Sequence, residues 1–287
     1  KKTELKISDK FSTMSIAKQF TATLILQEVE KGTIDLQTPI RKYLPDLKYS
    51  WAHCWDDVHQ GGTLLYAINT KDPVYINQVK KHLNYWTDSV TKIDGGLRWL
   101  STWGCLRYAT AAGFVTAVAN DRLITDATEK AKYKKFYEEQ VNYALGDNPD
   151  GRSYVVGFGE NPPKNPHHRT AHGSWENALA NPEVNRHILY GALVGGPTES
   201  GAYEDDRQNF INNEVATDYN AGYTALLCKM ISEYGGAPDT SFPQPETRTP
   251  EFFVEAELKQ NTTSSSTASL KFTNNTAWPA RIVDNVS

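Results

Sequence analysis

The sequence has 287 residues, 39% of them hydrophobic and 22% charged, which is typical of a globular protein with one large or two smaller domains. A net charge of -4 gives no reason to expect nucleic acid or an anionic membrane as a partner. No apolar run approaches the roughly 18 residues that a transmembrane helix needs, so no membrane span is predicted.

Residues 1–48 contain one predicted helix, at residues 15–31. Its apolar side chains recur at spacings of three and four residues and therefore share one face; they are Ile16, Phe20, Leu24, Ile25 and Val29. Gly32 follows as a stop signal.

Residues 49–236 form the main body, for which amphipathic periodicity predicts helices at 64–70, 74–86, 105–120, 126–145 and 215–233. Asp126 and either Asn212 or Asn213 are the expected N-caps, and Gly146 and Gly235 the expected helix stops. Residues 153–158 give the best strand-like pattern. The long loop 146–174 has little periodic structure, which is typical of a functional loop.

The last part of the chain has a different composition. Residues 237–250 carry four prolines and are predicted to be an extended, semi-rigid linker. Residues 251–287 alternate apolar and polar residues and are predicted to form β-structure.

The stretch YEDDRQNFINNEVATDYNAGY, residues 203–223, is rich in carboxylates, among them Asp205, Asp206, Glu214 and Asp218. A general acid needs a raised pKa, which burial or neighbouring carboxylates supply. Taken alone, however, this pattern favours a capped helix with an acidic lead-in loop.

A second stretch, SYVVGFGENPPKNPHHRTAHGSWEN at residues 153–177, changes that interpretation. His167, His168 and His172 do not have the spacing of a zinc site, and the three cysteines of the chain do not complete one. Imidazoles together with Arg169 and Trp175 suit hydrogen bonding to sugar hydroxyls better.

Both stretches resemble the two signatures of glycoside hydrolase family 9, a family of inverting endo- and exoglucanases. The first signature matches at Ser153, Val155, Val156, Gly159, Asn161, Pro166, His167 and Arg169. The second matches at Tyr203, Asp205, Phe210, Glu214, Ala216, Asn220 and Ala221. Two long, independent matches carry far more weight than one short motif.

This resemblance implies a mainly α fold, part of an (α/α)6 barrel with a short β-type C-terminal extension. It also implies a secreted cellulase of the endoglucanase type that hydrolyses the β-1,4-glucosidic bonds of cellulose with inversion. It requires no cofactor and leaves calcium open, with Asp56 or Asp57 as a ligand.

The resemblance also assigns roles to individual residues. Glu214 is implied as the general acid, Asp205 as the residue that holds it, and His167 and Arg169 as hydrogen-bonding partners of the glucosyl units. The further residues expected to bind substrate are His168, Tyr203, Tyr219 and Trp175.

The catalytic base of the family comes from a D-A-G-D motif, and this motif does not occur here. We therefore expect residues 49–236 to be the C-terminal part of the catalytic domain, with impaired activity. Residues 251–287 resemble the start of a family 3 carbohydrate-binding module.

Residues 11–45 resemble the serine β-lactamase, penicillin-binding protein and esterase superfamily, with Ser15 and Lys18 in an S-x-x-K motif. We therefore interpret residues 1–48 as a fragment of that superfamily. Two alternatives to a cellulase stay open: a serine hydrolase that uses Ser15 and Lys18, and a carbohydrate-binding remnant without catalysis.

Overall fold

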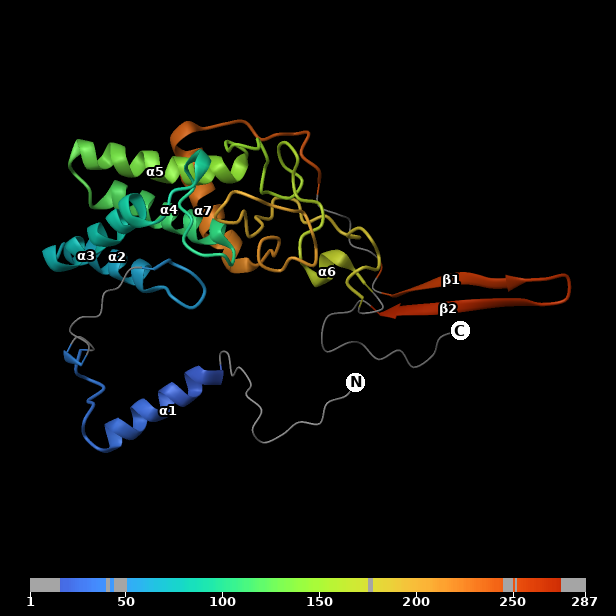
Figure 1. Cartoon of the computed structure of the whole chain (residues 1–287), viewed down its shortest axis with the longest axis horizontal. Coiled ribbons are helices and arrows are strands. Elements are labelled where there is room, and N and C mark those ends of the chain that lie inside the picture. Colours follow the sequence, from blue (N-terminus) through green and yellow to red (C-terminus); the bar gives the residue numbers. More distant parts are fainter. Residues whose placement is uncertain are drawn as a thin grey trace. The chain divides into compact units, whose positions relative to one another are not determined.

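The structure is a computed structural model, and it describes residues 16–39, 42–43, 51–174, 178–244, 250 and 252–274. The chain separates into two compact units, Lys1–Trp51 and Ala52–Ser287 (Figure 1). The four domain assignments made from the sequence stay predictions.

The first unit contains helix α1, Ala17–Glu30, which confirms the predicted helix. None of its residues is buried. Phe20 and Leu24 of the predicted apolar face are each 62% exposed, so this part of the face is largely open within the described residues.

The second unit is mainly helical, as predicted. Its elements are α2 His59–Thr70, α3 Pro73–Asn84, the π-helical turn η3 Tyr85–Ser89, the 3-10 turn η4 Asp94–Gly96, α4 Cys105–Arg122, α5 Ala127–Leu145, α6 Arg169–His172, α7 Thr217–Tyr234, β1 Phe252–Asn261 and β2 Ser266–Asn274. None of the helices in the described ranges is long and apolar enough to cross a membrane.

Helix α4 is the centre of this unit. It packs against α7, α5, α2 and α3, and 14 of its 18 residues are buried. Large side chains that are fully buried around it include Trp86, Leu106, Tyr137 and Leu226. Burial of each such side chain stabilises the fold by roughly 1.5–3 kcal/mol. The starts of α4 and α7 are thereby held on a rigid core.

Most predicted helix ends are confirmed, and one is wrong. The Asp126 carboxylate accepts the Glu129 backbone N–H at 2.8 Å at the start of α5, and Gly146 and Gly235 follow α5 and α7 as C-caps. The N-cap of α7 is Ala216, instead of Asn212 or Asn213. The Asn212 side chain instead donates to the Gly196 carbonyl, and the Asn213 side chain donates to the Asn165 carbonyl and the Asp205 carboxylate.

The predicted strand at 153–158 is also wrong, whereas the C-terminal β-structure is confirmed. Tyr154, Val155 and Val156 are all buried, so their apolar character reflects an irregular core segment with a single bridge, from Val155 to Leu193. Strands β1 and β2 form an antiparallel hairpin.

A buried histidine lies at the α2–α3 side of the unit. His82 is 5% exposed, and neither of its ring nitrogens has a hydrogen-bond partner among the described residues. Burial lowers its pKa to about 4; nearby His53 and His59 lower it further, while Asp57 opposes this effect. The neutral ring is therefore the form that the fold accommodates.

We expect this histidine to make the protein acid-sensitive. The unfolded chain takes up the proton near pH 6.5 and the folded chain only near pH 4, so stability is complete above pH 6.5 and falls by about 1.4 kcal/mol per pH unit between these values. In urea unfolding, the free energy of unfolding of His82→Leu should depend less on pH between these values. Above pH 7 the free energies of unfolding of the two proteins should differ by a constant amount, which reflects the change in packing. Equal slopes between pH 4 and 6.5 would contradict the assignment.

Candidate active site

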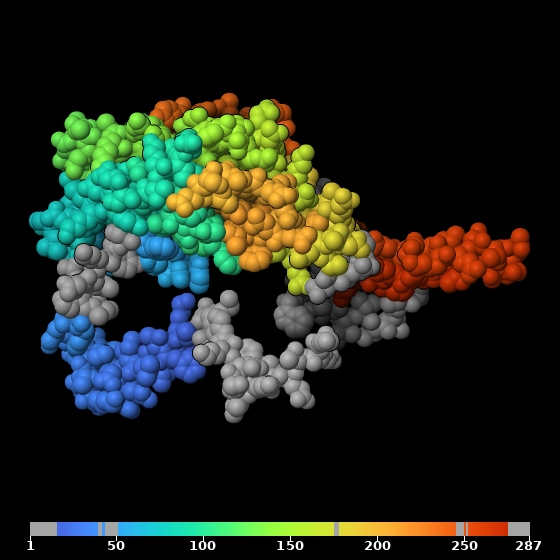
Figure 2. All heavy atoms as spheres, viewed as in Figure 1, coloured from blue at the N-terminus to red at the C-terminus, as the bar shows by residue number. Residues whose placement is uncertain are grey.

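The two signature stretches meet in the structure at the start of α7. Glu214 forms a parallel bridge with His167, and the His167 backbone N–H donates to the Asn213 carbonyl at 2.7 Å. In the space-filling view, the residues around 200–220, coloured orange, form a continuous stretch of the visible surface (Figure 2). The two stretches that the sequence linked to catalysis therefore lie side by side near the surface.

The carboxylate of Glu214 is held through one of its oxygens. Its Oε2 accepts hydrogen bonds from Trp103 Nε1 at 3.2 Å and from the Tyr219 hydroxyl at 2.9 Å. The other oxygen, Oε1, accepts none from the described residues. One oxygen is thus fixed in place, while the other is available to an incoming group.

An aromatic surface adjoins this carboxylate. The Trp103 and Phe210 rings lie 5.4 Å apart, and the Phe210 and His167 rings lie 6.0 Å apart. Trp103 is 43% and Phe210 46% exposed, which is unusual for large aromatic side chains. The sequence interpretation did not include Trp103, although a tryptophan directly before Gly104, the N-cap of α4, was a usable signal.

Asp205 joins three loop segments through hydrogen bonds to its carboxylate. Its carboxylate accepts the backbone N–H groups of Lys164 at 2.8 Å and Asn165 at 3.1 Å, and the Asn213 side-chain amide at 3.0 Å. Asn213 directly precedes Glu214. This geometry gives Asp205 a positioning contact with the Glu214 segment, and its assignment as a catalytic residue stays a prediction.

The neighbouring histidines are oriented by backbone contacts. His167 Nδ1 lies 2.7 Å from the Arg207 carbonyl oxygen, which can only accept, so Nδ1 carries the proton and Nε2 is the free nitrogen. His168 Nδ1 accepts the Ala171 N–H at 3.1 Å as the N-cap of α6, so its proton is on Nε2.

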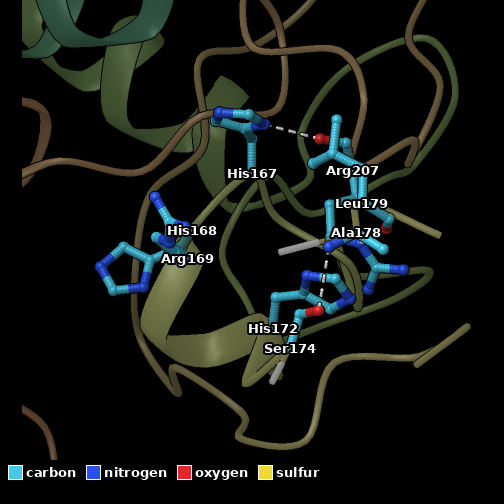
Figure 3. Close-up of a pocket in the computed structure, with 8 residues that line it drawn as sticks. All are labelled: His167, His168, Arg169, His172, Ser174, Ala178, Leu179 and Arg207. Carbon is cyan, nitrogen blue, oxygen red and sulfur yellow. Dashed lines mark hydrogen bonds between the residues drawn. The ribbon is translucent and has the colours of Figure 1, made fainter. Parts of the chain in front are cut away.

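A cavity of about 190 Å³ opens beside these histidines (Figure 3). Its lining residues are His167, His168, Arg169, His172, Ser174, Ala178, Leu179 and Arg207. Arg169 is exposed at the start of α6. Trp175, predicted to bind substrate, lies outside the described residues.

Arg207 builds one wall of this cavity, and our sequence analysis gave it no role. Its guanidinium donates to the backbone oxygens of Leu179 at 3.0 Å, Pro182 at 2.9 Å and Glu183 at 2.8 Å, and to Asn185 Oδ1 at 2.6 Å. It therefore ties the acidic loop to residues 179–185.

The two tyrosines predicted to bind substrate point their hydroxyls at the protein. Tyr203 donates to Asn213 Oδ1, and its ring packs edge-on against Tyr154 at 5.1 Å. Tyr219 is 1% exposed and donates to Glu214. Burial raises the pKa of both phenols, so both hydroxyls remain protonated donors. A substrate-binding role for either stays a prediction.

Asp218 is the nearest acidic neighbour of Glu214 on α7. Burial raises its pKa; the Arg107 guanidinium, 3.3 Å away, opposes this shift, and the charge of Glu214 adds to it. This carboxylate is already engaged in an ion pair.

The two aspartates considered for calcium, Asp56 and Asp57, both have hydrogen-bond partners in the protein. Asp56 Oδ1 lies 3.2 Å from the Cys54 sulfur, while Asp57 accepts from the His59 N–H at 3.2 Å and the Gln60 amide at 3.5 Å. Among the described residues, no three histidine, cysteine, aspartate or glutamate side chains could together hold a metal ion. Calcium binding at Asp56 or Asp57 stays a prediction.

Comparison with known proteins gives a match to the family model described as Glycosyl hydrolase family 9 over residues 17–227. The chain is 47% identical over 245 residues to Endoglucanase B of Cellulomonas fimi, covering 83% of this chain and 23% of that protein. It is 43% identical over 259 residues to Endoglucanase A of Bacillus pumilus, covering 86% of this chain and 39% of that protein.

Among solved structures, the chain is similar to the endoglucanase CelQ from Clostridium thermocellum complexed with cellobiose and cellotriose. The TM-score is 0.70 at 44% identity, over 93% of this chain and 45% of that one. The predicted fold, part of an (α/α)6 barrel with a short β-type extension, is confirmed. The chain spans less than half the length of each of these relatives.

These matches also bear on the two ends of the chain. The family match includes residues 17–45 and gives the serine β-lactamase resemblance no support. Ser15 lies outside the described residues, while Lys18 lies on α1. The comparisons likewise give no support for a family 3 carbohydrate-binding module at residues 251–287.

Proposed function

The chain belongs to glycosyl hydrolase family 9, and from this premise we propose that it cleaves β-1,4-glucan with inversion, with Glu214 as the general acid. The observation that carries the proposal is the Glu214 carboxylate, fixed through Oε2 by Trp103 and Tyr219 beside an exposed aromatic surface.

This geometry supports the proposed role of Glu214. Cleavage breaks the bond between the anomeric carbon and the glycosidic oxygen, and the departing oxygen needs a proton. A carboxylic acid fixed through one oxygen can present the proton on the other, and such transfer contributes typically 10²–10⁴-fold to the rate. Both donors to Oε2 favour Oε1 as the proton-bearing oxygen.

The surface beside Glu214 suits a glucan chain. The exposed faces of Trp103 and Phe210 offer flat apolar contact to sugar rings, and His167 Nε2 and Arg169 offer polar partners for hydroxyls. The complex of a 44% identical relative with cellobiose and cellotriose supports β-1,4-linked glucose as the ligand.

The weak element of the proposed reaction is the base. An inverting glycosidase needs a second carboxylate, roughly 6.5–9.5 Å from the acid, that takes a proton from the attacking water. Asp205 is saturated by three N–H donors, and Asp218 is ion-paired with Arg107. We therefore propose that hydrolysis by this chain is slow.

The stereochemistry of the product tests the reaction class. We expect cellotetraose to release α-anomers, visible by proton NMR before mutarotation, since water attacks opposite the departing oxygen. Ser15→Ala should leave the rate unchanged, because the reaction does not use the S-x-x-K motif. β-Anomers would overturn inversion, and complete absence of product would overturn hydrolysis by this chain.

A further inference from the structure

The guanidinium of Arg107 lies directly behind the two groups that hold Glu214. Arg107 is the third residue of α4, is 9% exposed and points toward the start of α7, where it meets Asp218. Since arginine is rarely buried to this extent without a specific set of partners, its contacts indicate its role.

Arg107 contacts both residues that donate to Glu214. One terminal nitrogen, Nη2, donates to the Trp103 backbone oxygen at 3.2 Å. The guanidinium carbon lies 4.8 Å from the centre of the Tyr219 ring, a cation–π contact. The residue thus contacts the main chain of one donor and the ring of the other.

The guanidinium is itself fixed from two further sides. Nη1 lies 3.3 Å from Asp218 Oδ2, and the side chains of this ion pair are only 10% and 19% exposed. Nη2 also donates to the Tyr108 hydroxyl at 2.5 Å. Because a guanidinium is planar and has donors on several edges, it can join these partners at once, which a lysine ammonium cannot do in the same way.

We propose that Arg107 is a positioning residue that fixes the Trp103 indole and the Tyr219 hydroxyl on Glu214 Oε2, with Asp218 as its anchor. Its role in catalysis rests on the proposed function, in which Glu214 is the acid. The contacts with Trp103, Tyr219 and Asp218 do not depend on turnover, so they can be tested without measuring sugar release.

The Trp103 indole N–H reports on this arrangement directly. The chain has seven tryptophans, so a sample labelled with ¹⁵N-tryptophan gives seven indole signals. The signal lost in Trp103→Phe identifies Trp103. Because the indole N–H donates to the Glu214 carboxylate, we expect Glu214→Gln, which replaces a charged acceptor by a neutral one, to shift this signal.

The decisive comparison is Arg107→Gln against Arg122→Gln. Arg122 is exposed in the last turn of the same helix, so it controls for loss of a positive charge on α4. Each variant is compared with and without Glu214→Gln. In the Arg107→Gln protein we expect Glu214→Gln to leave the Trp103 signal unshifted, while the other indole signals stay in their wild-type positions. Arg122→Gln should preserve the wild-type shift.

A wild-type shift of the Trp103 signal on Glu214→Gln in the Arg107→Gln protein would overturn the proposal. A Trp103 signal that does not respond to Glu214→Gln in the wild type would overturn it as well. If Arg107→Gln disturbs all indole signals through misfolding, Asp218→Asn provides the second test. It keeps the guanidinium and weakens its anchor, so we expect a reduced Trp103 shift, and an unchanged one also overturns the proposal. Absence of sugar release with these NMR results intact would count against the proposed function alone.

Discussion

Glu214→Gln is expected to reduce glucan cleavage by about 10²–10⁴-fold, the usual contribution of a general acid. Glutamine keeps the size of the side chain but cannot release a proton to the departing oxygen. Asp205 and Asp218 are both engaged by other groups, so neither is well placed to act as the catalytic base. The most informative assay therefore supplies azide, a nucleophile that needs no base.

In the azide reaction, a nitrogen of azide bonds to the anomeric carbon of cellotetraose while the bond to the glycosidic oxygen breaks. The departing oxygen still requires a proton, and Glu214 supplies it. We therefore expect azide to increase cleavage by the wild-type chain and to yield an α-glycosyl azide, whereas Glu214→Gln should show no such increase.

Glu204→Gln is a matched control, since this carboxylate is exposed in the same acidic loop and has no assigned role at the site. It should behave like the wild type. Equal azide-dependent cleavage in wild type and Glu214→Gln would contradict the acid assignment. No azide product from the wild type would contradict the proposed reaction as a whole.

The elements that could be predicted from the sequence are those set by local patterns. Helices α4 and α5 are long enough to be predicted from periodicity and composition, and the Asp126 cap and the Gly146 stop of α5 were predictable because they involve neighbouring residues only. The segment 153–158 failed because a buried irregular segment and a strand can have the same apolar composition.

The candidate site was predictable only in part, for a similar reason. Motif spacing identified Glu214 and His167, whose proximity the structure bears out. The contacts of Trp103 and Arg107 with the α7 segment depend on how α4 and α7 pack, and this packing cannot be predicted from local sequence patterns. Tertiary packing also decides that the Tyr219 hydroxyl points at Glu214.

The second large effect is expected at the crossing of α4 and α7. A Cβ atom on Gly222 of α7 would lie 2.6 Å from the Ala111 Cα and 3.0 Å from the Ala111 nitrogen of α4. Because these are backbone atoms, no side-chain rotation relieves the clash and the helices must separate. Overpacking costs about 1–3 kcal/mol, and a clash with backbone atoms places Gly222→Ala at the upper end, about 3 kcal/mol. Alanine gains about 1 kcal/mol over glycine in a helix, so we place the net loss at about 2 kcal/mol.

Gly62→Ala is the matched control, and its expected sign is opposite. Gly62 lies inside helix α2, and a Cβ there meets nothing within 4 Å among the described residues, so the substitution should stabilise the protein by about 0.5–1 kcal/mol. Urea unfolding measures both changes. Separation of α4 from α7 should also lengthen the 3.2 Å contact between Trp103 and Glu214, so Gly222→Ala should lose cleavage activity at temperatures where it remains folded. A Gly222→Ala protein as stable and active as Gly62→Ala would show that the close helix crossing does not hold the site together.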